Sequence, residues 1–246
     1  MVSREYYEMH NRDLTEVYSQ LSDDYSRSVM KSFVEQRISG NYKYSNGFIS
    51  DINNEYFEQD LFRVHKDIVL IDCGAYDGVD TIRFFKKFEN SVFSFVIEPD
   101  VNNINLIKEN LPNYNDRIQI VNKAIWDSST TISFSTGGGE GSGFNESGNE
   151  KVKTVCIDSL YAEYRDLFDE KDIIVKMDIE GIELKALQGA VNFIKEKHPI
   201  LSICVYHKQE DIFELPIYIK SIFPDYKLYL RRYDKGFRDT VLYAVP

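Results

Sequence analysis

The stretch from residue 68 to residue 100 constrains the fold of this chain more than any other part of the sequence. It begins with the apolar run Ile68 to Ile71, which leads into the turn DCGAYDG at residues 72–78. An amphipathic segment follows, and a second apolar run then ends at Glu98-Pro99-Asp100. A strand, a glycine turn, a helix and a strand with an acid at its tip form the first half of a nucleotide-binding α/β unit.

Two glycines, Gly74 and Gly78, carry this turn. Glycine lets the backbone turn sharply, and because it has no Cβ we expect a ligand to approach it closely. Glu98 stands at the end of the next strand, where such folds place the acid that accepts the ribose hydroxyls. Taken alone, the glycine spacing is also compatible with a tight turn that binds no ligand.

The charges in the turn distinguish between cofactors. A dinucleotide site uses G-x-G-x-x-G, with amides facing a pyrophosphate, whereas this turn reads D-x-G-x-x-x-G and Asp77 would repel a phosphate. Asp72, Asp77 and Glu98 instead suit a cofactor that carries a ribose, an ammonium and a positive sulfur. S-adenosylmethionine fits that description. An NAD-dependent oxidoreductase on the same sheet and a non-catalytic S-adenosylmethionine-binding protein remain the alternatives.

Composition excludes several classes of protein. The 246 residues carry a net charge of −11, which argues against nucleic acid as a partner because phosphate binding depends on Lys and Arg. The three cysteines form no Cys-x-x-Cys pair, so neither a zinc site nor a disulfide framework is indicated. No apolar run reaches membrane length, and the N-terminus lacks a signal-peptide core. We therefore expect a soluble, cytoplasmic protein that does not insert into membranes.

Residues 1–60 read as a helical extension ahead of a main domain at 61–246. Apolar residues recur at helical spacing from Leu14 to Val34, with a break near Asp23 and a stop at Gly40. The aromatic segment 42–60 could cover the cofactor site as a lid, or could simply pack against the sheet. A homo-oligomer is left open.

Further candidates follow two later strands. A third strand is expected over 117–125, and its end would supply the adenine wall from Ala124, Ile125 and Trp126, although a Trp there also suits packing. A hairpin is expected from 132–134 and 152–155. The glycine-rich segment between its arms, 136–143, could gate the substrate or form a surface loop.

The apolar strand 173–177 ends in DIEGIE at 178–183, followed by one helix over 184–194. Asp178 is a candidate for function because open α/β sheets place their sites at this edge, whereas Glu180 and Glu183 could equally cap the helix. The strand 200–205 delivers His207, a candidate general base that could also be structural. The last two strands, 226–230 and 240–245, predict an antiparallel hairpin that completes a mostly parallel α/β sheet.

Residues 56–246 resemble the FkbM family of S-adenosylmethionine-dependent methyltransferases. The resemblance rests on VLIDCGAYDG (69–78), VIEPD (96–100), KMDIEGIE (176–183), VYHKQED (205–211), YLRRY (229–233) and TVLYAV (240–245). It implies a Rossmann-like sheet of seven strands and O-methylation of a hydroxyl on a sugar, glycan or secondary metabolite. It also implies that Asp72, Gly74, Ala75 and Gly78 line the cofactor, that Glu98 takes the ribose, and that Asp178 lies beside the reacting centre. Residues 1–50 match the shared core poorly and are candidates for acceptor selection.

The residues at the ends of these strands together form one predicted site. Its catalytic candidates are Asp178 and His207, either of which would accept the hydroxyl proton. Asp178, Glu180 and His207 could instead hold a divalent ion, an alternative that we do not favour. The predicted cofactor-binding residues are Asp72, Gly74, Ala75, Tyr76, Asp77, Gly78, Glu98, Pro99, Ala124, Ile125, Trp126, Asp178 and Glu180.

Overall fold

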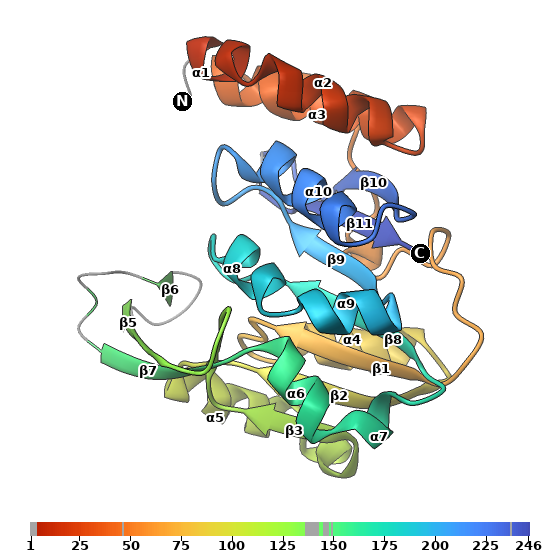
Figure 1. Cartoon of the computed structure of the whole chain (residues 1–246), viewed down its shortest axis with the longest axis vertical. Coiled ribbons are helices and arrows are strands. Elements are labelled where there is room, and N and C mark those ends of the chain that lie inside the picture. The colour runs from red at the N-terminus through yellow and green to blue at the C-terminus, as the bar shows by residue number, and fades with distance from the viewer. Residues whose placement is uncertain (1–3, 46, 136–142, 145–147, 149, 237) are drawn as a thin grey trace. The chain divides into compact units, whose positions relative to one another are not determined.

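The computed structural model (Figure 1) describes residues 4–45, 47–135, 143–144, 148, 150–236 and 238–246. The chain forms two compact units, one of residues 1–62 with 200–246 and the other of residues 63–199. The first unit therefore contains the predicted N-terminal extension and also the C-terminal segment. The main sheet has seven strands, as expected, and they are divided between the two units.

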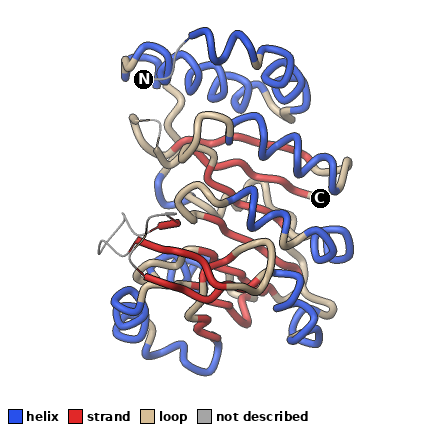
Figure 2. Tube along the Cα trace, turned by 60° about the vertical axis from the view of Figure 1, so that its left-hand side comes forward, coloured by secondary structure: helices blue, strands red, loops and turns tan. Residues whose placement is uncertain are grey.

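The second unit alternates strands with helices, which Figure 2 draws in red and blue. Four parallel strands form its part of the main sheet, in the order β8-β1-β2-β3. Its elements are β1 (Ile68–Cys73), α4 (Val79–Lys87), β2 (Ser91–Ile97), α5 (Val101–Asn110), η3 (Pro112–Arg117), β3 (Ile118–Val121), β4 (Ala124–Ile125), β5 (Thr131–Ser135), β6 (Gly143–Phe144), β7 (Glu150–Val155), α6 (Ile157–Glu163), α7 (Arg165–Phe168), β8 (Asp172–Met177), α8 (Glu183–Gln188) and α9 (Val191–Lys197).

Both faces of this parallel sheet are buried. In β2, Val96 packs with Ile104 and Ile107 of α5 on one face. The preceding residue, Phe95, stacks on Phe168 of α7 on the opposite face, with ring centroids 5.5 Å apart. Successive side chains of a strand point to opposite faces, so a strand covered on both sides reads as a continuous apolar run. This explains why β1, β2 and β8 are visible in the sequence.

The predicted third strand is wrong at its C-terminal end. β3 stops at Val121, and β4 belongs to a second sheet of order β4-β7-β5-β6. The reason is Asn122, whose side-chain amide donates to the carbonyl oxygens of Glu98 and Pro99, both at 3.0 Å, and so turns the chain away from β2. The predicted hairpin is confirmed, because β5 and β7 pair antiparallel. Of the proposed glycine-rich gate, residues 136–142 lie outside the described residues.

The helix expected over 184–194 is two helices, α8 and α9. They separate at Gly189, where a methyl group would lie 2.3 Å from the carbonyl oxygen of Trp126. The chain needs a residue without a side chain at this close approach, and the helix is interrupted there.

The first unit contains α1 (Arg4–Met9), α2 (Asn11–Gln20), α3 (Asp24–Ser39), η1 (Tyr42–Ser45), η2 (Ile52–Asn54), β9 (Ile200–Cys204), α10 (Asp211–Ile222), β10 (Lys227–Arg232) and β11 (Thr240–Val245). The predicted break and stop are confirmed. Asp23 caps α3 by accepting a hydrogen bond from the Ser26 amide at 2.6 Å, and α3 ends at Gly40 in a left-handed conformation. β11 pairs antiparallel with both β10 and β9, which confirms the C-terminal hairpin.

Two of the aromatic residues considered for a lid belong to the core of the first unit. Tyr56 and Phe57 are buried, and the Tyr56 carbonyl accepts a hydrogen bond from the Ser202 hydroxyl at 2.8 Å. Tyr42, in contrast, is 64% exposed. Among the described residues, none of the helices has the length and apolar character needed to span a bilayer.

The β1–α4 turn packs directly on the segment that follows β8. Gly74 has φ +77°, and a methyl group there would lie 1.9 Å from the carbonyl oxygen of Asp178. At Gly78, with φ +81°, a methyl group would lie 2.3 Å from the Leu111 side chain. The space that a Cβ would occupy at each glycine is therefore filled by the protein itself, and the close approach of a ligand to this turn stays a prediction.

Replacing Gly74 by Ala should therefore destabilise the fold severely. The left-handed backbone and the clash with Asp178 together should cost roughly 2–5 kcal/mol of unfolding free energy. Gly47 has φ +86° with nothing within 4 Å of an added methyl group. Gly47→Ala therefore measures the cost of the left-handed backbone alone, about 1–2 kcal/mol of unfolding free energy. Chemical denaturation of both variants checks this. Equal losses would show that the contact with Asp178 is not tight.

Candidate active site

The carboxyl ends of three neighbouring parallel strands meet at one edge of the second unit. β1 ends in the Gly74 turn, β2 is followed by Glu98, and β8 is followed by Asp178. Ligands of open α/β sheets bind at this edge. The site is therefore built from residues that the sequence places directly after each strand.

Glu98 is a carboxylate held in one orientation. Its Oε1 accepts hydrogen bonds from the Asp100 amide at 2.9 Å and the Asn103 side chain at 3.3 Å, and its Oε2 accepts from the Tyr76 amide at 3.0 Å. The residue is 5% exposed. Burial raises the pKa of Glu98, and these three hydrogen bonds oppose the shift. Pro99, which follows, is half-buried.

Two residues that support Glu98 were missed by sequence reasoning. Asp100 caps α5 by accepting a hydrogen bond from the Asn102 amide at 2.8 Å, and Asn103 lies one turn further along the same helix. Both are buried. The sequence does contain the corresponding pattern, an acid suited to an N-cap three residues after the end of β2 and an amide side chain three positions later.

Asp72 belongs to a buried ion pair, and its predicted contact with the cofactor stays a prediction. Its side chain is fully buried, with Oδ1 3.1 Å from the Lys176 ammonium and Oδ2 accepting from the Thr81 hydroxyl at 2.7 Å. Burial raises the pKa of the Asp72 carboxyl, and the Lys176 charge opposes that shift. The charge of Asp72 is therefore directed at the protein interior.

Asp77 lies at the N-terminus of α4. Its Oδ1 accepts a hydrogen bond at 3.0 Å from the amide of Val79, which is the first residue of the helix. Dinucleotide-binding folds place a pyrophosphate at this amide end. Here a carboxylate of the chain itself takes that place. The rest of the turn consists of buried Ala75 and of Tyr76, which has φ +49° and is 38% exposed.

The segment after β8 forms a turn with two residues in left-handed conformation and does not continue as extended backbone. Glu180 and Gly181 both have positive φ, +57° and +89°. Glu183 is fully buried, and its Oε1 accepts from the Ile179 amide at 3.2 Å and the Gly181 amide at 3.4 Å. Both amides lie ahead of α8, so Glu183 stabilises the turn itself, and its capping of the helix stays a prediction.

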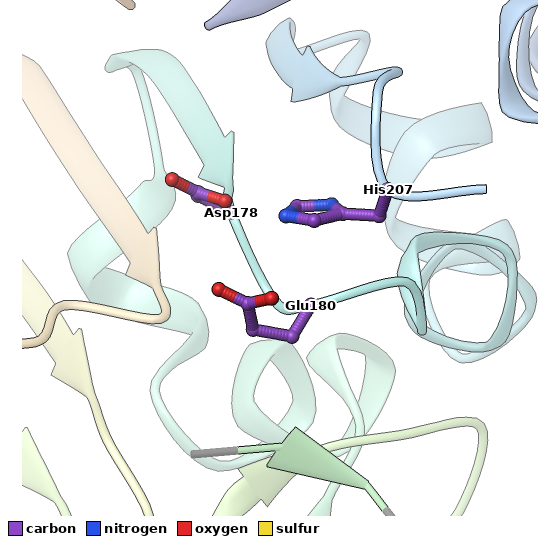
Figure 3. Close-up of side chains that lie close together, drawn as sticks. All are labelled: Asp178, Glu180 and His207. Carbon is purple, nitrogen blue, oxygen red and sulfur yellow. The ribbon is translucent and has the colours of Figure 1, made fainter. Parts of the chain in front are cut away.

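Asp178 and Glu180 remain as the carboxylates of this turn. Figure 3 shows Asp178 directly after β8 and Glu180 further along toward α8. Asp178 is half-buried, and one of its oxygens lies within 4.8 Å of an oxygen of Glu180. Its backbone amide donates to the Cys73 carbonyl at 3.1 Å, which ties the turn to the end of β1.

His207 belongs to the first unit, on the loop after β9 that Figure 3 also draws. Its ring lies against Tyr206, with centroids 4.2 Å apart, and a ring nitrogen is within 4.8 Å of a carboxylate oxygen of Asp211. Asp211 also accepts from the Lys208 amide at 2.6 Å. The joint action of His207 with Asp178 stays a prediction, as does the divalent-ion alternative.

The proposed adenine wall lies in the second sheet. Ala124 and Ile125 are buried in β4, which pairs with β7. Trp126 follows, half-buried, with the Lys185 ammonium 5.9 Å from its ring centroid. A contact of these three residues with an adenine stays a prediction.

Comparison with known proteins identifies the family. The model of the methyltransferase FkbM domain matches residues 72–238. The chain belongs to this family. The match covers the β1–α4 turn, Glu98, the turn after β8 and His207, so the resemblance inferred from the sequence and the Rossmann-like fold are both confirmed.

A solved structure supports the same assignment. The chain is similar to an FkbM methyltransferase from Methylobacillus flagellatus KT, with 26% sequence identity and a TM-score of 0.80. The alignment covers 96% of this chain and 59% of that one, so this chain spans about three fifths of the length of that structural relative. A precorrin-6y methyltransferase from Geobacter metallireducens is more distant, at 11% identity, a TM-score of 0.45 and coverage of 81% and 88%. No curated protein matches the chain.

The positive φ of Glu180 gives a test of backbone strain in the FkbM domain. Glu180→Gly and Glu180→Ala both remove the carboxylate, but only glycine adopts this conformation without cost. The glycine variant should be more stable than the alanine variant by about 1–2 kcal/mol. Denaturant unfolding of the pair measures the difference directly. If both variants unfold at the same denaturant concentration, the turn is not strained.

Proposed function

We propose that the FkbM domain transfers a methyl group from S-adenosylmethionine to a hydroxyl of a sugar, glycan or secondary metabolite. The proposal rests on membership of the family and on one structural observation, the fixed carboxylate of Glu98 at the tip of β2. We further propose that the reaction takes place in the cytoplasm.

Glu98 has the properties that a ribose acceptor needs. Two hydrogen bonds to Oε1 and one to Oε2 set its orientation. A carboxylate offers about four acceptor positions, so Oε2 keeps capacity for a hydroxyl. Because the acceptor is already oriented and largely desolvated, little ordering is needed when a ribose binds.

Asp77 argues for an adenosyl cofactor with a sulfonium over a dinucleotide. Its carboxylate accepts from the first amide of α4, which is the position a pyrophosphate would need. A phosphate there would meet a negative charge at close range. A cofactor with a cationic methionine moiety meets no such repulsion.

Bound S-adenosylmethionine would supply an electrophilic methyl group for in-line displacement. The chain then has to align the acceptor oxygen, and such positioning contributes up to roughly 7–11 kcal/mol in intramolecular models. A sugar hydroxyl is a poor nucleophile, so we assign proton removal to a carboxylate oxygen of Asp178 or a ring nitrogen of His207. General-base catalysis contributes about 10²–10⁴-fold.

We assign acceptor selection to the N-terminal helices. The family match begins at residue 72, so α1, α2 and α3 lie outside it. A segment that is not shared by the whole family is suited to choosing among acceptors, while the shared residues hold the common cofactor.

Transfer of a labelled methyl group into a panel of nucleotide sugars, glycans and small hydroxylated metabolites tests the activity. With the acceptor found there, Asp178→Asn or His207→Ala should lower turnover by about 10²–10⁴-fold, because the proton acceptor is lost. Near-full turnover of both variants would refute this assignment. Loss of activity in EDTA and recovery with Mg²⁺ would favour the divalent-ion alternative.

Glu98 predicts a pH dependence of cofactor binding. A ribose hydroxyl donates to the ionised carboxylate, so affinity should fall as the pH is lowered through the pKa of Glu98, which burial raises above its ordinary 4.5. Calorimetric titration with S-adenosylmethionine from pH 8 down to pH 4, below that ordinary value, measures this.

The matched variant is Glu98→Gln, which cannot ionise. It should bind more weakly than the wild type at pH 8, and its affinity should not vary with pH between these limits. Wild-type affinity that is equally flat would contradict a direct contact between Glu98 and the cofactor.

A further inference from the structure

Lys176 is a buried cation, the residue before the last one of β8, just ahead of the active-site loop. It is 2% exposed and stands directly opposite Asp72 in the register of β8 with β1. Lysine is rarely buried to this extent unless its charge is matched, because removing an ammonium from water is costly. Its position therefore calls for a specific explanation.

The Lys176 ammonium joins three parts of the second unit. It donates to the Gly74 carbonyl at 2.7 Å, and it lies 3.1 Å from Oδ1 of Asp72 and 3.4 Å from Oδ2 of Asp80. These partners belong to the start of the glycine turn, the end of β1 and the first turn of α4. One side chain thus contacts each segment that frames the turn.

The same contacts connect the turn to the segment after β8. Lys176 is two residues before Asp178, whose amide bonds to Cys73 and whose carbonyl fills the space beside Gly74. The turn is also held by its own amides, since Gly74 and Ala75 both donate to the Ile97 carbonyl. A shift of the Gly74 carbonyl would therefore disturb both the turn and the Asp178 loop.

We propose that Lys176 is a positioning residue, which holds the Gly74 carbonyl so that the turn 74–78 has the shape that receives the cofactor. This rests on the proposed function of the turn. The competing role is that of a counterion for Asp72. The two roles differ in one respect. A counterion is no longer needed once Asp72 is neutral, whereas the hydrogen bond to the Gly74 carbonyl is still needed.

Two variants separate these roles. Lys176→Met removes the ammonium and leaves Asp72 without its buried partner, so stability should fall. Lys176→Met combined with Asp72→Asn removes both charges and keeps an acceptor for the Thr81 hydroxyl. Asp80, the other carboxylate beside Lys176, keeps its ion pair with Arg83 at 2.9 Å. The double variant should recover most of the lost thermal stability without recovering the donor to Gly74.

A matched control exists at the other end of the same two strands. Lys171 lies 3.3 Å from Asp67, one residue before β8 and β1 respectively. Lys171→Met and its combination with Asp67→Asn change the same residue types across the same strand pair. They do not touch the turn, so they should leave its properties unchanged.

Two measurements are made on each variant. The first is the dissociation constant of S-adenosylmethionine by calorimetry, and the second is amide hydrogen exchange at Gly74, Ala75 and Gly78. In the Lys176/Asp72 double variant we expect affinity to drop about tenfold or more, as for the loss of a charged hydrogen bond. The three amides should exchange faster while the β2 amides stay protected, and the Lys171/Asp67 control should match the wild type.

Wild-type affinity and exchange in the Lys176/Asp72 double variant would overturn the proposal and leave Lys176 as a counterion only. Faster exchange throughout the unit, including β2, would also overturn it, because the effect would then be global. If the wild type does not bind S-adenosylmethionine, the proposed function fails. The exchange data still decide whether Lys176 holds the turn.

Discussion

The contact between Gly74 and the backbone of Asp178 is the constraint on which the candidate site depends. It requires a residue without a Cβ at the end of β1, and it fixes the distance between two loops that leave neighbouring strands. The hydrogen bond from the Asp178 amide to the Cys73 carbonyl also holds these two loops together. The β1–α4 turn and the candidate base Asp178 are thus positioned by one set of backbone contacts within the second unit.

The electrostatics of the site differ from a simple row of acids at strand ends. Asp72 is compensated inside the protein by Lys176, and Asp77 is directed at the amide end of α4. Glu98 is the carboxylate that stays oriented at the tip of its strand, because three N–H groups hold it. The cost of burying that charge is reflected in the raised pKa of Glu98. In the proposed function, discrimination against phosphate falls to Asp77 and recognition of ribose to Glu98.

Much of the second unit could be predicted from the sequence because its strands are buried on both faces and its turns contain glycine. The ends of α3 were predictable for a similar reason, since Asp23 and Gly40 act locally. The pairing of Lys176 with Asp72 was not predictable, because periodicity shows which face a residue occupies and not which partner it meets across a sheet. The separation of α8 from α9 at Gly189 and the departure of β4 from the main sheet depend on contacts with Trp126 and Glu98, both distant in the chain. Such contacts exist only once the chain has folded.

The central claim is that the carboxyl edge of the second unit binds an adenosyl cofactor with a sulfonium and does not bind a dinucleotide. Calorimetric titration of the unmodified chain with S-adenosylmethionine and, separately, with NAD tests it most directly. We expect saturable one-to-one binding of S-adenosylmethionine and no heat of binding with NAD. Saturable binding of NAD, with none of S-adenosylmethionine, would contradict it.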